Sequence, residues 1–180
     1  MDRVELDYQM VLLQNGDETA FEVIYNETKR GLFSFILSFC KNYHTAEDIM
    51  QNTYIKLRTS VQSYTAGSNA LAWIFTIAKN LALNDIAKRK REVYSDFEQG
   101  AVEYGEYTID DKMTSPLLKI IEQNLNEAEQ RIVLLYLVSG FKHREIADML
   151  NKPLGTVLWT YRNAISKLRK VMEKENKDED

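Results

Sequence analysis

The chain is poor in the residues that build disulfides, metal centres and tight turns. Its 180 residues include a single cysteine, Cys40, and two histidines. One cysteine cannot form an internal disulfide or a cysteine-based zinc site. Seven glycines and two prolines fall below the average usage of about 7% and 5%. Because β-sandwiches and barrels need many turn residues, this scarcity favours long helices.

Long apolar runs and a leader pattern are also missing. The run at 132–138 is one of the longest, and a membrane-spanning helix needs about 20 residues. The N-terminus carries Asp2, Glu5 and Asp7 in place of the basic-then-apolar pattern of a signal peptide. We therefore expect no membrane insertion and a cytoplasmic location.

Patterns for catalysis and cofactor binding are absent from the sequence. It contains no nucleophile arrangement, no glycine-rich phosphate loop and no His-Glu zinc helix. His44 lies near Glu47 and Asp48, but this spacing lacks a third or fourth ligand elsewhere. We expect a protein that is not an enzyme and has no metal or cofactor.

Charge is distributed in blocks. The net charge is −4 and the pI is about 5.4. Residues 79–91 nevertheless carry a net charge of +4 and residues 142–174 one of +5, whereas residues 92–116 carry −6. A polyanion meets the local blocks and not their average, so the acidic pI does not exclude a nucleic-acid partner.

Hydrophobic periodicity predicts an all-α protein with two small helical domains joined by an acidic flexible linker, the second domain containing a helix-turn-helix. We assign the first domain to residues 1–91, the linker to 92–116, the second domain to 117–174 and a frayed tail to 175–180.

Turn and cap residues predict where the helices of the first domain begin and end. Asn15-Gly16 predicts a turn, Asp17 and Thr45 predict helix N-caps, and residues 59–69 read as a loop. A long helix is expected from Ala70 to Arg91. Its expected inward residues are Trp73, Ile74, Ile77, Leu81 and Ile86.

The sharpest local pattern, between His143 and Leu168, is typical of a helix-turn-helix. Ala147 supplies the small residue at the helix crossing, Asn151 accepts a left-handed turn, and Val157 anchors the second helix. Thr156 can cap this second helix or contact a phosphate. An ordinary αα-hairpin would show the same features.

Two further helices carry polar faces that could bind a partner or simply be solvated. The helix from 70 to 91 ends in Lys88-Arg89-Lys90-Arg91, which suits either phosphate contact or the negative end of the helix dipole. In the segment 46–54 the polar side chains lie opposite the apolar stripe. They are Glu47, Asp48, Gln51 and Asn52.

These patterns, in this order, resemble the extracytoplasmic-function type of bacterial RNA polymerase sigma factor. The resemblance covers nearly the whole chain. It rests on GDETAF at 16–21, AEDIMQNTY at 46–54, AWIFTIAKN at 72–80, EIADML at 145–150 and PLGTV at 153–157.

The resemblance implies that the first domain docks on core RNA polymerase and opens promoter DNA. Docking on the β′ clamp would use the polar face of Glu47, Asp48, Gln51 and Asn52. At the minus-10 element, a loop from Ser63 to Asn69 would hold a flipped base. The residues implied to contact the strand or its backbone are Lys79, Asn80, Asn84, Lys88 and Arg91.

The resemblance also implies that the second domain reads the minus-35 element, while the acidic linker threads polymerase channels that normally hold nucleic acid. The implied partners are promoter DNA and core RNA polymerase, with its β and β′ subunits. The implied contacts are Thr156, Leu158, Trp159, Arg162 and Asn163. In many relatives an anti-sigma factor holds the protein inactive, which makes such a factor a candidate partner.

The chain departs from the family pattern at two places. Asn52 stands where a glutamate is usual, and Leu158-Trp159-Thr160 replace exposed basic residues of the recognition helix. The promoter preference of relatives therefore does not carry over. Two other interpretations stay open: a stand-alone helix-turn-helix regulator that does not bind polymerase, and a helical adaptor that binds protein through Leu158 and Trp159.

Overall fold

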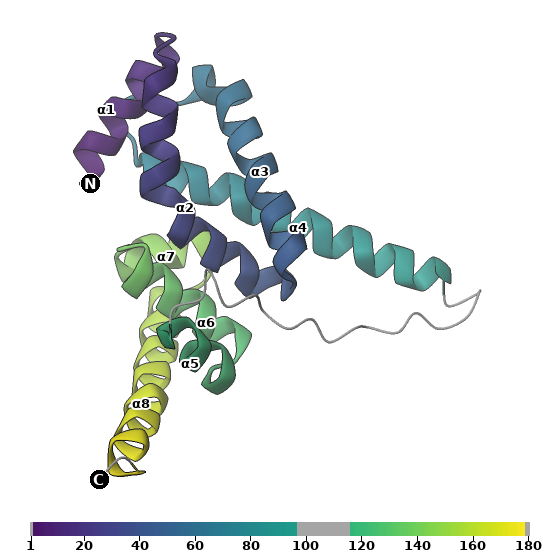
Figure 1. The fold of residues 1–180 in the computed structure, drawn as a ribbon, viewed down its shortest axis with the longest axis vertical. Coiled ribbons are helices and arrows are strands. Elements are labelled where there is room, and N and C mark those ends of the chain that lie inside the picture. Colours follow the sequence, from purple (N-terminus) through teal and green to yellow (C-terminus); the bar gives the residue numbers. More distant parts are fainter. Residues whose placement is uncertain (1, 97–115, 179–180) are drawn as a thin grey trace. The chain divides into compact units, whose positions relative to one another are not determined.

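The computed structural model describes residues 2–96 and 116–178, and every regular element in those ranges is a helix (Figure 1). The chain divides into two compact units, residues 1–109 and 110–180. The expected all-α class with two helical domains is thereby confirmed. None of the described helices has both the length and the apolar character needed to cross a bilayer.

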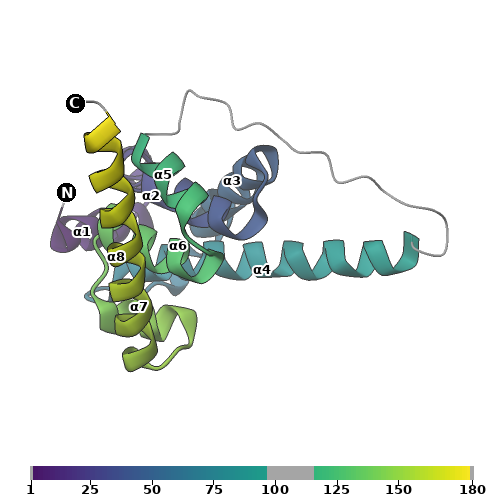
Figure 2. The same ribbon diagram turned by 90° about the horizontal axis from the view of Figure 1, so that it is seen from below.

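The first unit is a helical bundle in which α4 runs across the other helices, its C-terminal part extending beyond them (Figures 1 and 2). Within residues 2–96 the elements are α1 (Arg3–Gln14), α2 (Glu18–Cys40), α3 (Tyr43–Ser60), the short 3-10 turn η1 (Val61–Ser63) and α4 (Ala70–Asp96).

The helix ends follow the cap residues, with one correction. Asp17 caps α2 by accepting a hydrogen bond of 2.9 Å from the Thr19 backbone N–H, as predicted. Thr45 does not cap α3, because α3 begins two residues earlier and Asn42 accepts from the Thr45 N–H at 2.9 Å. The asparagine side chain is short and reaches the first-turn N–H groups from an extended backbone.

The buried face of α4 is rotated from the one we expected. Ile74 is fully buried as predicted, but Trp73, Ile77, Leu81 and Ile86 are only partly buried. The fully buried residues are instead Ala70, Ile74, Phe75, Ala78 and Ala82. Since α4 packs against α1, α2 and α3, small alanines along this face allow the backbones to approach closely.

Two expected boundaries lie elsewhere in the structure. Helix α3 continues to Ser60 and is followed by η1, so the loop after it is shorter than the predicted 59–69. Helix α4 continues to Asp96, beyond the residue 92 at which we expected the linker to begin. The rest of the expected linker, 97–115, lies outside the described residues.

The second unit packs three short helices around the long helix α8. In the part described, from 116 to 178, the short helices are α5 (Pro116–Asn124), α6 (Glu127–Val133) with its π-helical extension η2 (Leu134–Val138), and α7 (His143–Leu150). The long helix α8 spans Leu154–Asp178. Ile121 and Leu125 pack with Val133, Ala164 and Leu168 in one core cluster. Helix α8 passes residue 174, where we expected a frayed tail to follow.

A capping box and an ion pair with the half-exposed Lys167 both depend on Glu129. Asn126 accepts from the Glu129 N–H at 3.0 Å, and the Glu129 carboxylate accepts from the Asn126 N–H at 3.0 Å. The carboxylate is buried, and Lys167 of α8 donates to it at 2.7 and 2.8 Å. One side chain therefore both starts α6 and fixes it to α8.

The turn between α7 and α8 has the left-handed residue that the sequence predicts. Asn151 adopts φ 52° and ψ 50°, and the Lys152 N–H donates to the Ala147 carbonyl at 2.9 Å. Thr156 is not the N-cap of α8, because the helix already begins at Leu154. Ile146 and Val157 are fully buried and hold the two helices together.

We expect Asn151→Val to lower the free energy of unfolding of the second unit by about 1–2 kcal/mol, the usual cost of a left-handed backbone for a residue with a bulky β-carbon. Asn151 is exposed, so no packing is lost. Asn151→Gly is the matched control and leaves stability near that of the parent. Denaturant unfolding followed by circular dichroism measures both, and equal losses for valine and glycine would contradict the explanation.

Candidate functional site

Helix α3 presents one polar face to solvent. Asp48, Gln51 and Asn52 are exposed and Glu47 is partly exposed, while Ile49 and the other residues of the apolar stripe are buried. The four predicted docking residues thus share one face. The Glu47 carboxylate lies 3.8 Å from Nδ1 of His44, and no cluster suited to a metal ion occurs among the described residues.

The outer face of α4 carries most of the predicted minus-10 residues. Asn80, Asn84 and Lys88 follow one another at four-residue steps and are exposed, and Arg91 continues the same face. Lys79 differs from them because it is partly buried. Four-residue steps place side chains in one row along a helix, so this row could follow a nucleic-acid backbone.

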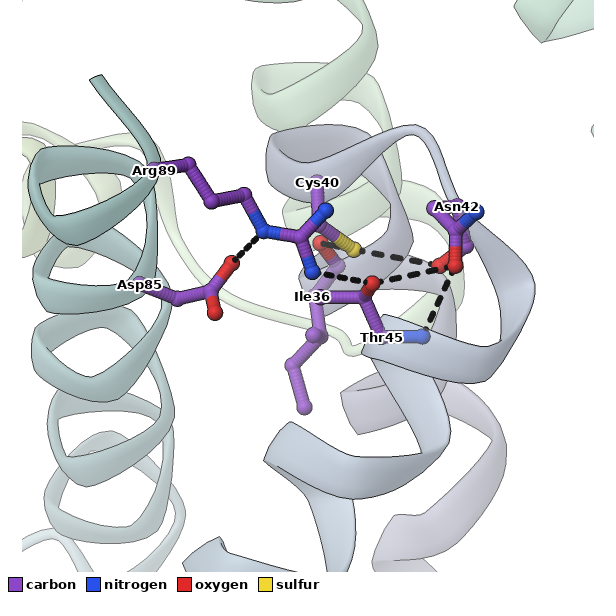
Figure 3. Close-up of polar contacts among 6 residues, drawn as sticks. All are labelled: Ile36, Cys40, Asn42, Thr45, Asp85 and Arg89. Carbon is purple, nitrogen blue, oxygen red and sulfur yellow. Dashed lines mark hydrogen bonds and ion pairs between the residues drawn. The ribbon is translucent and has the colours of Figure 1, made fainter. Parts of the chain in front are cut away.

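Arg89 does not belong to that row. Its Nε lies 2.8 Å from the Asp85 carboxylate, and its terminal nitrogen donates to the Thr45 hydroxyl at 2.5 Å (Figure 3). Thr45 in turn donates to Asn42, the cap of α3. The guanidinium therefore connects α4 to the start of α3, the helix with the polar face.

Cys40 lies beside this polar junction and takes part in the turn between α2 and α3. Its Sγ lies 3.4 Å from the carbonyl oxygens of Ile36 and Asn42 (Figure 3). Burial raises the pKa of the thiol. The thiol is thus held protonated at neutral pH, as suits a structural group and not a nucleophile.

Hydrogen bonds at both ends of the loop before α4, and from helix α1, hold this loop in place. Ser63 is exposed and its hydroxyl donates to the Ser60 carbonyl at 2.7 Å. Asn69 caps α4, since its Oδ1 accepts from the Ala72 N–H at 3.0 Å. From α1, Asp7 accepts from the Gly67 N–H at 3.0 Å. The predicted base-holding residues flank this loop.

Helix α8, the predicted recognition helix, exposes fewer of its predicted contact residues than the sequence suggests. Trp159 is 66% exposed and is the largest apolar side chain projecting from the start of α8. Thr156 and Arg162 are exposed, whereas Leu158 and Asn163 are partly buried. Thr160, which we expected to be exposed, is buried, with 9% of its surface exposed. It lies about one turn after Val157, on the side of α8 that faces the core of the unit.

Three aromatic rings from η2, α7 and α8 pack against one another in the second unit. Tyr136 of η2 stacks on His143 of α7 at 4.4 Å between centroids, and Tyr161 of α8 lies 4.7 Å from each. Burial lowers the pKa of His143 and raises that of Tyr161, so both rings are held neutral at pH 7. The contacts among these three rings fix how α8 is rotated about its axis, and thereby which side chains it exposes.

Sequence reasoning missed Asp7 and gave Arg89 no role of its own: it left the run Lys88-Arg89-Lys90-Arg91 open between phosphate contact and the helix dipole, and the implied minus-10 contacts do not include Arg89. Asp7 is an acidic residue in an amphipathic helix, and no local pattern distinguishes it from Glu5 or Asp2. Arg89 follows Asp85 by four residues, a spacing that favours an intrahelical ion pair, and this signal could have separated it from Lys88 and Arg91.

Comparison with known families gives one match in each unit. The model for Sigma-70 region 2 matches residues 24–92, and that for Sigma-70 region 4 matches residues 121–169. Together they span more than half of the chain. The chain belongs to the extracytoplasmic-function family of RNA polymerase sigma factors. It is an alternative sigma factor, which directs transcription initiation.

Relatives of this sigma factor match over most of their length. SigW of Bacillus subtilis is 26% identical over 174 residues, 89% of this chain and 92% of the relative. EcfG of Rhodopseudomonas palustris is 28% identical over 146 residues, 78% of each chain. Among solved structures, RpoE of Bartonella quintana in complex with the anti-sigma factor NepR gives a TM-score of 0.65 at 25% identity. It covers 85% of this chain and 96% of that chain.

A second solved structure shares the fold. CnrH, in complex with the cytosolic domain of CnrY, gives a TM-score of 0.62 at 15% identity and covers 93% of this chain and 97% of that chain. The matched Sigma-70 region 2 contains α3 and most of α2 and α4, and the matched region 4 contains α6, η2, α7 and about two thirds of α8. Helix α1 lies outside both matches.

We expect Arg89→Ala to lower the free energy of unfolding of the first unit by roughly 1–2 kcal/mol, because it leaves a partly buried Asp85 carboxylate without its cation. Arg91→Ala is the matched control, since among the described residues its side chain bonds within its own helix, to the Ala87 carbonyl at 3.2 Å. Its effect should stay within about 0.5 kcal/mol.

Trp73 fluorescence in a Trp159→Phe background reports unfolding of the first unit alone, because these are the two tryptophans of the chain. Equal destabilisation by the two alanine variants would contradict a clamping role for Arg89.

Proposed function

We propose that this sigma factor docks on the β′ clamp of core RNA polymerase through Glu47, Asp48, Gln51 and Asn52. The support is the exposed polar face of α3, in which two carboxylates and two amides project together. Such a face suits a partner helix that presents basic and hydrogen-bonding groups. Asn52 in place of the usual glutamate lowers the charge of the face but keeps a hydrogen-bonding group there.

We further propose that α4 and the loop before it open the minus-10 element. Asn80, Asn84, Lys88 and Arg91 would follow the strand or its backbone, with Lys79 at the edge of the row, and the loop between Ser63 and Asn69 would receive an unpaired base. The geometric support is the exposed row along α4, the helix that this loop precedes; the row begins at Asn80, ten residues after the first residue of the helix, Ala70. A row of amide and basic groups that follows a strand, on the same unit as a loop that receives a base, suits single-strand binding.

The second unit would read the minus-35 element with the start of α8. Thr156, Trp159 and Arg162 are exposed there, with Leu158 and Asn163 at their edges. The Trp159 ring could contact a thymine methyl group, while Arg162 and Asn163 could reach phosphates or base edges. This readout depends on apolar contact more than is usual for recognition helices.

Other parts of the proposal concern partners and location. The acidic linker segment 92–116, at −6, would pass along basic channels of the core enzyme. An anti-sigma factor is proposed as a regulator, because the similar RpoE structure is a complex with the anti-sigma factor NepR. The protein would act in the cytoplasm without catalytic activity of its own, and core RNA polymerase carries out the chemistry.

Reconstitution with core RNA polymerase tests the proposal directly. The sigma factor is mixed with core enzyme from its own source and with fragmented genomic DNA, and the transcripts are sequenced. We expect defined start sites that share two upstream motifs, and Asp48→Arg should abolish both these transcripts and core binding. Glu22→Arg, the same reversal on an exposed residue of α2, is the control and should leave transcription intact.

The outcome separates the proposal from its closest alternative. A stand-alone helix-turn-helix regulator would bind DNA without core enzyme, and Asp48→Arg would then change nothing. Normal core binding by the Asp48→Arg variant would exclude the proposed docking face.

We expect Trp159→Ala to weaken protection of the minus-35 element by about tenfold, the size of a lost base contact. Trp159 is 66% exposed, so its removal costs little folding stability. Met172→Ala, another exposed apolar residue on α8, is the control. Footprinting of the holoenzyme on one promoter measures the effect, and an unchanged minus-35 footprint would refute the role of Trp159.

A further inference from the structure

Helix α1 holds the loop before α4 at two points. Near its start, the two carboxylate oxygens of Asp7 accept from the Gly67 N–H at 3.0 and 3.1 Å, and the Tyr64 hydroxyl donates to the same carboxylate. At its end, Gln14 Nε2 donates to the carbonyl oxygens of Val61 and Tyr64, both at 2.8 Å. Asp7 and Gln14 lie seven residues apart, on one face of α1.

The Asp7 carboxylate stabilises an unusual backbone conformation at Gly67. Gly67 has φ +77°, so its N–H is presented by a left-handed turn that few other residues would adopt. A charged acceptor strengthens bonds from such groups roughly twofold compared with a neutral one. Without the carboxylate, the tip of the loop would keep the bond from the Tyr64 hydroxyl to the Ser68 carbonyl at 3.1 Å and its own backbone bond from the Ser68 N–H to the Thr65 carbonyl, but the Gly67 N–H would lose its charged acceptor.

Tyr64 transmits this support to α4. Its ring is buried and lies edge-on to Trp73, with centroids 5.5 Å apart, in the first turn of α4. Burial and the neighbouring Asp7 raise the pKa of Tyr64 to about 12, which keeps the hydroxyl a donor at physiological pH. The four residues at the tip of the loop, next to the buried Tyr64 ring, are exposed: Thr65, Ala66, Gly67 and Ser68.

We propose that Asp7 is a positioning residue for promoter opening, which holds the 64–68 loop in the conformation that receives an unpaired base of the minus-10 element. This inference rests on the proposed function of the loop. Capturing a flipped base costs less when the receiving loop is already ordered, because no chain entropy is lost on binding. Helix α1 thus contributes to DNA opening without touching the DNA through Asp7.

An abasic scan of the minus-10 strand tests the proposal. Holoenzyme carrying the full chain is bound to single-stranded oligonucleotides in which each base of the element is removed in turn. With the parent protein we expect one position at which base removal weakens binding by about tenfold. With Asp7→Ala, that position should lose its effect, while the intact oligonucleotide binds about tenfold more weakly.

Matched variants separate positioning from general damage. Glu5→Ala removes the same charge from an exposed residue of α1 and should leave the scan unchanged. Tyr64→Phe removes only the hydroxyl and should give an intermediate loss at the same position, which keeps the test decisive if Asp7→Ala folds poorly. Core binding should be equal in all variants.

Two results would overturn the inference. If Asp7→Ala and Tyr64→Phe weaken binding but retain the full abasic effect, the contacts only stabilise the fold. If the parent holoenzyme shows no position-specific abasic effect, the proposed function of the loop fails as well. Normal core binding with normal minus-35 protection would then confine that failure to the loop.

Discussion

The close packing of α4 against the other helices of its unit is the constraint on which the proposed activity depends. Phe75 stacks near Phe35 of α2 with ring centroids 5.3 Å apart, and Ala78 and Ala82 are fully buried. Small residues at these positions let the backbones approach closely, so the helix cannot rotate without opening the core. Its outer row of amides and basic residues is therefore held at a fixed angle to the polar face of α3.

Polar contacts at the two ends of this packed region add what apolar packing cannot supply. Apolar contacts are non-directional, whereas a carboxylate that accepts from a backbone N–H or from a guanidinium fixes an orientation. Asp7 fixes the loop at the start of α4, and Arg89 fixes the far part of α4 to the first turn of α3. The Asp7 carboxylate and the Arg89 guanidinium both bind groups of the protein itself, although the sequence alone would assign each of them to solvent or to DNA.

The sequence predicts what depends on local pattern and misses what depends on packing. The all-α class, the Asp17 cap and the left-handed Asn151 follow from residue type and spacing, and the structure confirms them. The rotation of α4 about its own axis, which decides which of its residues are buried, could not be predicted, because it depends on how α1, α2 and α3 pack against it. Thr160 was misassigned for a related reason: threonine is ambiguous between core and solvent. For the candidate site, the exposed face of α3 was predictable, while the role of Asp7 required a contact sixty residues away.

The arrangement of charge explains how an acidic protein can act on DNA. Acidic residues on α3 and in the linker face a protein partner in the proposed complex, and the outer row of α4 and the exposed start of α8 face the nucleic acid. With a Debye length of about 8 Å at physiological salt, each surface responds mainly to its own neighbours. Association with a polyanion then needs no net positive charge, only separation of the two signs onto different helices. Arg89 is paired with Asp85, so in the proposed complex the strand would meet fewer free cations at the end of α4 than the run of four basic residues at 88–91 implies.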